Sequence, residues 1–351
     1  MASAEKRKYE NNLTAEGQNE TNLPENTQEE KGENQIKKVE MPYIVFDCET
    51  TGLDEEKDRI IQLAMIKVFP ATKDQIIYEK LFNPEVRREN QITAYKIHKI
   101  SPDILLTEKP FQFYAEEILE FLNGVQYLVG HNILFDLEFL TNAFKRLGLN
   151  QKHGIPWVDL LKRIDFSVID TFKMSIYAFP ALERNRLVDI ANHLGIETTC
   201  KKVISYSVSS PKKKKQDPVK MITGEGDGLH NAVMDVLVTN EIFLECIEEL
   251  KRKQPDIINQ TILLDSRYTY RLPNLEIIDR AIVDESSITS NDKEAIKFQA
   301  ESSMSALRYT KRRFLKDLSK SELLSDISFL KKRNGVANKR EVKLREILLN
   351  N

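Results

Sequence analysis

Acidic residues and histidines gather in three short stretches of this 351-residue chain. They are listed in chain order as Asp47-Cys48-Glu49-Thr50-Thr51-Gly52, then His131-Asn132 with Phe135-Asp136, then His230-Asn231-Ala232 with Asp235. Together they supply four carboxylates and, in His230, a candidate base. Hard divalent cations prefer oxygen ligands, and two such ions about 3.5–4 Å apart can stabilise both the attacking and the leaving oxygen of an in-line displacement. These residue types therefore predict two-metal hydrolysis of a phosphodiester.

The first pair of acids ends a predicted strand. Residues 43–48 are apolar, β-branched or aromatic up to Asp47, which is typical of a buried strand that Glu49 extends. Side chains two apart on a strand share a face, so Asp47 and Glu49 can point at one place while Cys48 packs on the other face. Two acids ending a hydrophobic strand are unfavourable unless a cation compensates them. We expect Mg²⁺ or Mn²⁺ there, as a pair of ions.

The other two acids fall on predicted helices. A strand at 127–129 precedes a helix for which Asn132 is the expected N-cap, with an apolar stripe that ends near Gly148. The third stretch opens a helix from about 231 to 250. His230 and Asp235 are five residues apart, about 140° around an ideal helix, so they cannot both face one metal as helical neighbours. We expect His230 on the preceding loop, reaching the site as a base, while Asp235 holds metal.

The three stretches resemble the signature segments of the DEDDh family of 3′→5′ exonucleases. The likeness is greatest to the proofreading exonucleases of bacterial DNA polymerase III, the epsilon subunit and its relatives, and covers about 41–250. The resemblance implies a ribonuclease-H-like fold. It also implies that Asp47, Glu49, Asp136 and Asp235 bind two metal ions and that His230 deprotonates the attacking water.

The resemblance extends to substrate contacts. Ile97-His98-Lys99-Ile100 resembles the family's Ile-His-Gly-Ile segment, which implies that His98 contacts the terminal nucleotide, although Lys99 replaces a glycine. The remaining expected substrate-binding residues are Thr50, Thr51, Gly52 and Leu53, which would cradle the 3′ end, and Asn132 and Phe135, which would support it.

A structural role competes with each functional role. Asp-x-Glu alone is more often a solvated loop edge, and His230 alone could be a polar helix start. His98 beside two isoleucines is as readily packed against a core as in contact with substrate. We interpret His153 and His193 as structural and Asp170 as a helix cap. The joint order of the three motifs is what favours the metal site.

Composition limits the class of protein. With 41% hydrophobic residues the chain can bury one good core and part of a second. Three scattered cysteines offer neither a disulfide framework nor a zinc spacing, which predicts a reducing compartment. No secretory segment or apolar run of membrane-spanning length is found, so we expect a cytoplasmic protein with no membrane partner, compatible with association with the nucleoid.

The chain divides into three predicted regions. Residues 1–40 are polar and predicted to be a disordered leader. Residues 41–250 form the predicted exonuclease domain, an α/β fold with strands at about 43–48, 60–68 and 75–82 in an antiparallel meander, followed by alternating helices and strands. This order predicts a mixed sheet flanked by helices. Residues 251–351 are predicted to be a mainly helical, basic extension, with a helical pattern from about 291 and a capping box at Ser319 and Glu322.

Two basic segments stand outside the motifs. An insertion at about 196–229 contains four successive lysines, 212–215, which are either a solvated hairpin tip or a contact for a phosphate backbone. Between Arg308 and Glu346 there are thirteen basic and five acidic residues, which gives a local charge of +8 in a chain whose net charge is −2. This tail could follow phosphates or dock on a DNA polymerase subunit or another acidic partner, and both alternatives stay open.

Three functions are compatible with these patterns. The first is a metal-dependent exonuclease that releases nucleoside 5′-monophosphates from 3′ ends, DNA more than RNA, in proofreading or repair. The second is an RNA-trimming enzyme of the same family, which would differ in how the site treats the 2′-hydroxyl. The third is a non-catalytic module that binds nucleic acid or a polymerase; four convergent acids argue against it.

Overall fold

The computed structural model describes residues 41–86, 92–198, 231–254, 262–263, 265, 267–303, 305, 307, 313–333 and 335–350. The described residues all lie in one compact unit, Lys37–Asn351. The predicted leader at 1–40, most of the predicted insertion and His230 lie outside them.

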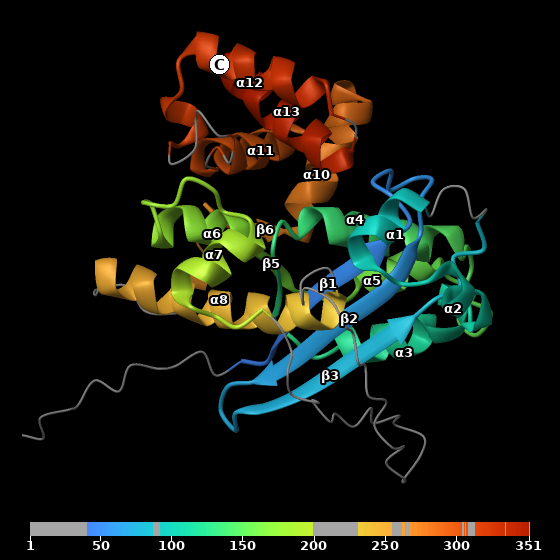
Figure 1. The fold of residues 1–351 in the computed structure, drawn as a ribbon. Coiled ribbons are helices and arrows are strands. Elements are labelled where there is room, and N and C mark those ends of the chain that lie inside the picture. Colours follow the sequence, from blue (N-terminus) through green and yellow to red (C-terminus); the bar gives the residue numbers. More distant parts are fainter. Residues whose placement is uncertain are drawn as a thin grey trace, which may run out of the picture. The chain divides into compact units, whose positions relative to one another are not determined.

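A mixed six-stranded sheet organises the described part of the chain (Figure 1), in the order β3-β2-β1-β4-β5-β6. The strands are β1 (Tyr43–Thr50), β2 (Ile60–Phe69), β3 (Asp74–Leu81), β4 (Tyr127–Gly130), β5 (Ser167–Asp170) and β6 (Thr269–Arg271). β1 pairs antiparallel with β2 and β2 with β3, which confirms the predicted meander. β4 is parallel to both β1 and β5, while β6 is antiparallel to β5.

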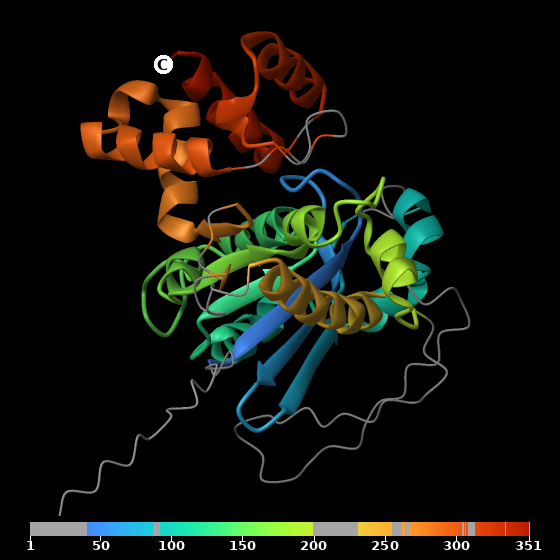
Figure 2. The ribbon, with the colours of Figure 1, turned by 90° about the vertical axis from the view of Figure 1, so that its left-hand side faces the viewer.

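Helices cover both faces of the sheet, and alternate residues of β1 are therefore buried on opposite sides. One face packs against α6 (Thr171–Ala178), α7 (Leu187–Leu194) and α8 (Ala232–Lys253). The other face packs against α3 (Ala115–Leu122), α4 (Leu134–Arg146) and α5 (Trp157–Lys162). Figure 2 shows α8 lying across the sheet. Two short helices, α1 (Ile92–His98) and α2 (Pro102–Thr107), and the 3₁₀ turn η2 (Phe111–Tyr114) connect β3 to α3.

The C-terminal region is helical, as predicted, but its structure begins before residue 291. β6 adds a strand to the sheet and leads directly into α10 (Leu272–Val283). The following elements are η3 (Glu285–Ser287), α11 (Ser290–Ser302), η4 (Leu315–Asp317), α12 (Lys320–Lys331) and α13 (Val336–Leu349). The capping box of Ser319 and Glu322 begins α12 as predicted. These helices enclose a separate hydrophobic cluster of their own.

Across the described ranges, we find no helix with the length and apolar character needed to cross a bilayer.

Candidate metal and exonuclease site

The first two acids share one face of β1. Asp47 lies opposite Ala64 and Glu49 opposite Gln62 in the antiparallel register with β2. Cys48, between them, is buried on the other face with Ile44 and Phe46, as the alternation predicted. Asp47 and Glu49 remain partly exposed at the end of a strand whose other residues are buried. The strand therefore presents two carboxylates toward the same side of the sheet.

Asp136 reaches the same strand from α4. The parallel pairing of β1 with β4 extends only from Tyr43 to Val45, so the later part of that strand edge can take other partners. Asp136 Oδ1 accepts hydrogen bonds from the backbone N–H of Cys48 at 3.1 Å and from its thiol at 3.2 Å. This contact places the third carboxylate next to the first two.

Asp235 is brought in by the first turn of α8. The side chain of Asn231 accepts from the backbone N–H of Val233 at 3.1 Å and caps the helix at the residue predicted to begin it. One oxygen from each of Asp47, Glu49 and Asp235 lies within 4.8 Å of the others. Residues of β1 and α8, far apart in the sequence, thus bring three carboxylates together.

Gln62 fixes the approach of α8 to β1. Its Oε1 accepts from the backbone N–H of Ala232 at 3.1 Å, and its Nε2 donates to Glu79 at 2.7 Å. Because Gln62 lies opposite Glu49 in the sheet, it holds the start of α8 beside the acids. The motifs do not include Gln62; the available signal was a buried-strand position that carries an amide.

The electrostatics of the cluster favour a bound cation. Burial, and then the negative charges of Asp136, Asp235 and Glu49, raise the pKa of Asp47 well above its ordinary value. Burial and the same kind of repulsion raise the pKa of Glu49 to about 8. Burial raises the pKa of Asp136 to about 7, although hydrogen bonds from Cys48 oppose the shift. Oxygen ligands crowded in this way fit a hard divalent cation, which would offset their mutual repulsion.

The loop after β1 carries four expected substrate-binding residues. Thr50 Oγ1 donates to the carbonyl of Gly52 at 2.6 Å, which tightens the turn. The hydroxyl of Thr51 donates to Asp58 at 2.9 Å and accepts from the backbone N–H of Arg59 at 3.0 Å. Leu53 is 80% exposed. The threonines therefore shape the loop, and Leu53 is an apolar side chain that the loop presents to solvent.

His98 ends α1 and is 7% exposed. Its Nδ1 accepts from the backbone N–H of Ile100 at 3.0 Å. Lys99, which stands where the resembling family has glycine, has a φ of 59°, in the left-handed region. The backbone conformation that favours glycine is therefore present even though the residue is lysine.

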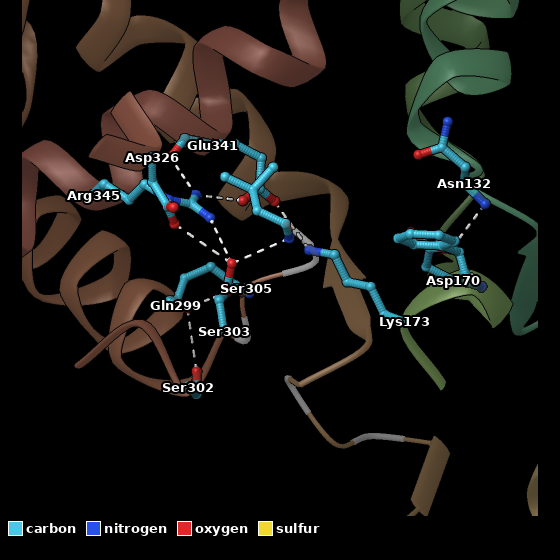
Figure 3. Close-up of polar contacts among 12 residues, drawn as sticks. Asn132, Asp170, Lys173, Gln299, Ser302, Ser303, Ser305, Asp326, Glu341 and Arg345 are labelled. Atoms are coloured by element: carbon cyan, nitrogen blue, oxygen red, sulfur yellow. Dashed lines mark hydrogen bonds and ion pairs between the residues drawn. The ribbon is translucent and has the colours of Figure 1, made fainter. Parts of the chain in front are cut away.

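Asn132 corrects one prediction, because it is not the N-cap of the following helix. It has a φ of 60°, and α4 begins at Leu134 after Ile133, with no side-chain cap. Its backbone N–H donates to Asp170 Oδ1 at 2.9 Å (Figure 3), and its carbonyl accepts from Phe135 at 3.2 Å. Asparagine tolerates the left-handed conformation, so it serves here as a turn residue before the helix.

The surroundings of Asn132 are structural. Asp170 caps α6, as predicted, and accepts from the backbone N–H of Phe172 at 3.0 Å. His131 is hydrogen-bonded to Thr171 Oγ1 at 3.1 Å and to the carbonyl of Asn185 at 3.0 Å. Burial lowers the pKa of His131 to about 4, so its imidazole is neutral at physiological pH.

Phe135 is partly buried and packs against Phe139, with ring centroids 4.8 Å apart. His153 is exposed, and His193 lies in α7 with its ring against Phe179. His230 and the lysine run at 212–215 lie outside the described residues.

Comparisons with known proteins relate part of the chain to exonucleases. Residues 44–201 match the family model described as "Exonuclease", RNase T. The chain is 28% identical over 238 residues to the 3′-5′ exonuclease DinG of Bacillus subtilis, covering 66% of this chain and 20% of the relative. It is 32% identical over 163 residues to DNA polymerase III PolC-type of Bacillus cereus, covering 46% of this chain and 10% of the relative.

Solved structures are more distant. Escherichia coli exonuclease I in complex with a dT13 oligonucleotide aligns with a TM-score of 0.45 and 19% identity, over 65% of this chain and 44% of that one. The matches to the DinG and PolC-type relatives span only a tenth to a fifth of the length of those proteins. The similarity to the exonuclease family model lies in residues 44–201 of this chain.

Proposed function

We propose that this chain is a metal-dependent 3′→5′ exonuclease that hydrolyses phosphodiester bonds at nucleic-acid 3′ ends and releases nucleoside 5′-monophosphates, with DNA favoured over RNA. The observation that carries the proposal is the arrangement of four carboxylates from β1, α4 and α8. Asp47, Glu49 and Asp235 each place one oxygen within 4.8 Å of the others, and Asp136 is hydrogen-bonded to Cys48, between the two acids of β1. The family match over 44–201 supports the reaction class, and the name of the DinG relative supports the direction.

Asp47, Glu49, Asp136 and Asp235 would hold two divalent ions, Mg²⁺ or Mn²⁺. When bound, these ions supply positive charge that stabilises the developing charge on the scissile phosphate. His230 would take the proton from the attacking water, since an ordinary histidine pKa near 6.5 suits that transfer at cellular pH.

The surface for the terminal nucleotides would comprise several of the residues expected from the motifs. They are Thr50, Thr51, Gly52, Leu53, His98, Asn132 and Phe135. Leu53 is the most exposed apolar member and would contact a base, while the threonines set the loop that carries it.

The polymerase name of the PolC-type relatives supports a role in proofreading or repair and a polymerase subunit as partner of the C-terminal extension. In the described part of that extension, however, Arg313, Lys331, Arg340, Lys343 and Arg345 form ion pairs with acids of this chain. Fewer basic groups are therefore available to phosphates or to an acidic partner than the local charge of +8 indicated.

A time course on 5′-labelled single-stranded DNA, duplex DNA with a mismatched 3′ end, and RNA tests the proposal. With Mg²⁺ or Mn²⁺ the wild type should shorten DNA from the 3′ end, and chelation or Asp47→Asn should stop it. Asp189→Asn is the matched control, because that acid lies on α7 paired with Arg186. Faster loss of RNA would indicate the RNA-trimming enzyme. If the protein binds these substrates but shortens none of them with either metal, the non-catalytic binding module is favoured.

A further inference from the structure

The loop Thr51–Arg59 is closed on itself beside the acids. The backbone N–H of Thr51 donates to the carbonyl of Arg59 at 2.9 Å, and that of Asp58 donates to the carbonyl of Asp54 at 2.7 Å. The hydroxyl of Thr51 ties the same ends together through Asp58 and Arg59. These hydrogen bonds close the loop at its base, and contacts from outside hold the rest of it, including Leu53, in place.

Glu55 supplies that outside contact. It is 8% exposed, and its Oε1 accepts from the backbone N–H of Val336, the first residue of α13, at 2.6 Å. The preceding residue, Gly335, has no side chain to cap the helix. A carboxylate at a helix N-terminus satisfies a free N–H and is favoured by the helix dipole. Glu55 thus caps a helix that begins 281 residues further along the chain.

The same residue is held from a second side by α4. The carbonyl of Glu55 accepts from Asn142 Nδ2 at 3.1 Å and from Arg146 Nη2 at 2.7 Å. Glu55 consequently joins the loop to the helix that carries Asp136 and to the C-terminal extension.

Two ion pairs fix α13 on the exonuclease domain. Arg340 Nη1 lies 2.6 Å from Glu138 Oε1 on α4, and both side chains are 7% exposed. Lys173 on α6 lies 3.0 Å from Glu341 (Figure 3), and their side chains are 7% and 17% exposed. Glu341 also binds Arg345, which in turn binds the buried Asp326 on α12. The helix that receives Glu55 is therefore braced on both the domain and the extension.

We propose that α13 positions the loop Thr51–Arg59 for binding of the nucleic-acid 3′ end, with Glu55 as the positioning residue. The inference rests on the proposed exonuclease function. Asp47 and Glu49 lie on β1, which β2 and β4 hold without help from α13. Loss of the Glu55 contact would let the loop leave its binding position. The apparent affinity for the nucleic-acid 3′ end would then fall in proportion to the fraction of molecules whose loop stays in that position.

The kinetic test compares three loop variants with the wild type on 5′-labelled single-stranded DNA with Mg²⁺. Glu55→Ala should raise KM about five- to tenfold and leave kcat within about twofold. Glu55→Gln, whose amide oxygen can still accept from Val336, should restore KM to within about twofold of wild type. Glu56→Ala changes the neighbouring exposed acid and should behave as wild type.

Val336→Pro tests the contact from the other side. Proline is tolerated at the first position of a helix and lacks the N–H that Glu55 accepts. It should raise KM as much as Glu55→Ala does, and the double variant should add nothing further. Additive effects, or an unchanged KM in Glu55→Ala, would overturn the positioning role.

Hydrogen exchange at the Thr51 and Arg59 amides separates this inference from the proposed function. Faster exchange in Glu55→Ala and Val336→Pro, with wild-type exchange in Glu56→Ala, supports positioning whether or not the protein degrades DNA. Unchanged exchange in all variants refutes it. A wild type that degrades no substrate refutes the proposed function alone.

Discussion

The carboxylates at the end of β1 make the stability of the metal-free protein fall as pH rises. In the folded protein Glu49 has a pKa of about 8, raised from 4.5. Between these values the folded state keeps a proton that the unfolded state releases, so rising pH favours unfolding. Asp136, with a pKa raised to about 7, and Asp47 act in the same direction. The loss continues through the folded-state pKa values and levels off above them.

Two arguments give the size of this loss of stability. Two unit charges 4.8 Å apart repel by about 3 kcal/mol at an effective dielectric constant of about 20. Asp47 and Glu49 are partly exposed, so solvent reduces each pair among the three acids to about 1 kcal/mol. Linkage for Glu49 alone gives about 1.4 kcal/mol per pH unit over the roughly two units from pH 6 to pH 8. Linkage for Glu49 alone thus gives about 2–3 kcal/mol, and the pair repulsions of the three acids sum to about 3 kcal/mol. Because Asp136 and Asp47 act in the same direction, we predict a loss of at least about 2–3 kcal/mol between about pH 6 and pH 9.

Urea unfolding measures this loss. Trp157, the single tryptophan, packs against Phe144 in the core and should report unfolding by its fluorescence. In the presence of a chelator the free energy of unfolding should fall from about pH 6 to about pH 9. Saturating Mg²⁺ should raise stability more at the higher pH, because the cation binds the ionised acids.

Substitutions assign the effect. Glu49→Gln should flatten the pH dependence, whereas Asp189→Asn, which removes a partly exposed acid on α7 that is paired with Arg186, should keep the wild-type slope in this range. If the chelated wild type and Glu49→Gln lose stability equally over this range, the acids do not repel one another and the reasoning fails.

Three further changes test the surrounding scaffold. Gly52→Ala would place a Cβ against the carboxylate of Asp58, so we expect about 1–2 kcal/mol lower stability in urea and a raised KM; a neutral effect would show that the loop yields freely. Asp170→Ala removes the acceptor of two backbone N–H groups and should cost about 2–3 kcal/mol in thermal unfolding, while an unchanged Tm would contradict this. Arg345→Met removes the guanidinium that pairs with the buried Asp326 and should cost about 3–5 kcal/mol, most of it recovered by adding Asp326→Leu; no recovery would refute the charge argument.

Local patterns predicted the elements that carry the acids. The alternation of buried and polar residues in β1 placed Asp47 and Glu49 on one face, and Asn231 was correctly identified as the start of α8. Each of these signals acts over a few residues, where strand period and capping chemistry are decisive. The prediction for Asn132 was wrong because it also used only local information. Asn132 has the residue type of a cap, but its backbone is held by Asp170, 38 residues away.

Long-range contacts escaped the sequence analysis. Gln62 meets Ala232 across 170 residues, and Glu55 meets Val336 across 281. Neither contact has a local signature, because glutamine in a strand or glutamate in a loop is usually a solvated side chain. Only the pairing of elements shows that these two residues fix the site.

Charge counting does not show which basic groups of the C-terminal extension are exposed, because a net charge does not say where each side chain lies. Arg340 and Arg345 are 5% and 0% exposed, and each is bound to carboxylates. A buried guanidinium without partners would be prohibitively costly, so these arginines require acids at matching places. Some of those acids, such as Glu138 on α4, lie on helices that flank the sheet. In the other direction, Glu341 of the extension pairs with Lys173 on α6. This exchange of opposite charges favours a basic extension that binds its own domain first, with phosphates or a polymerase left to the exposed lysines and arginines.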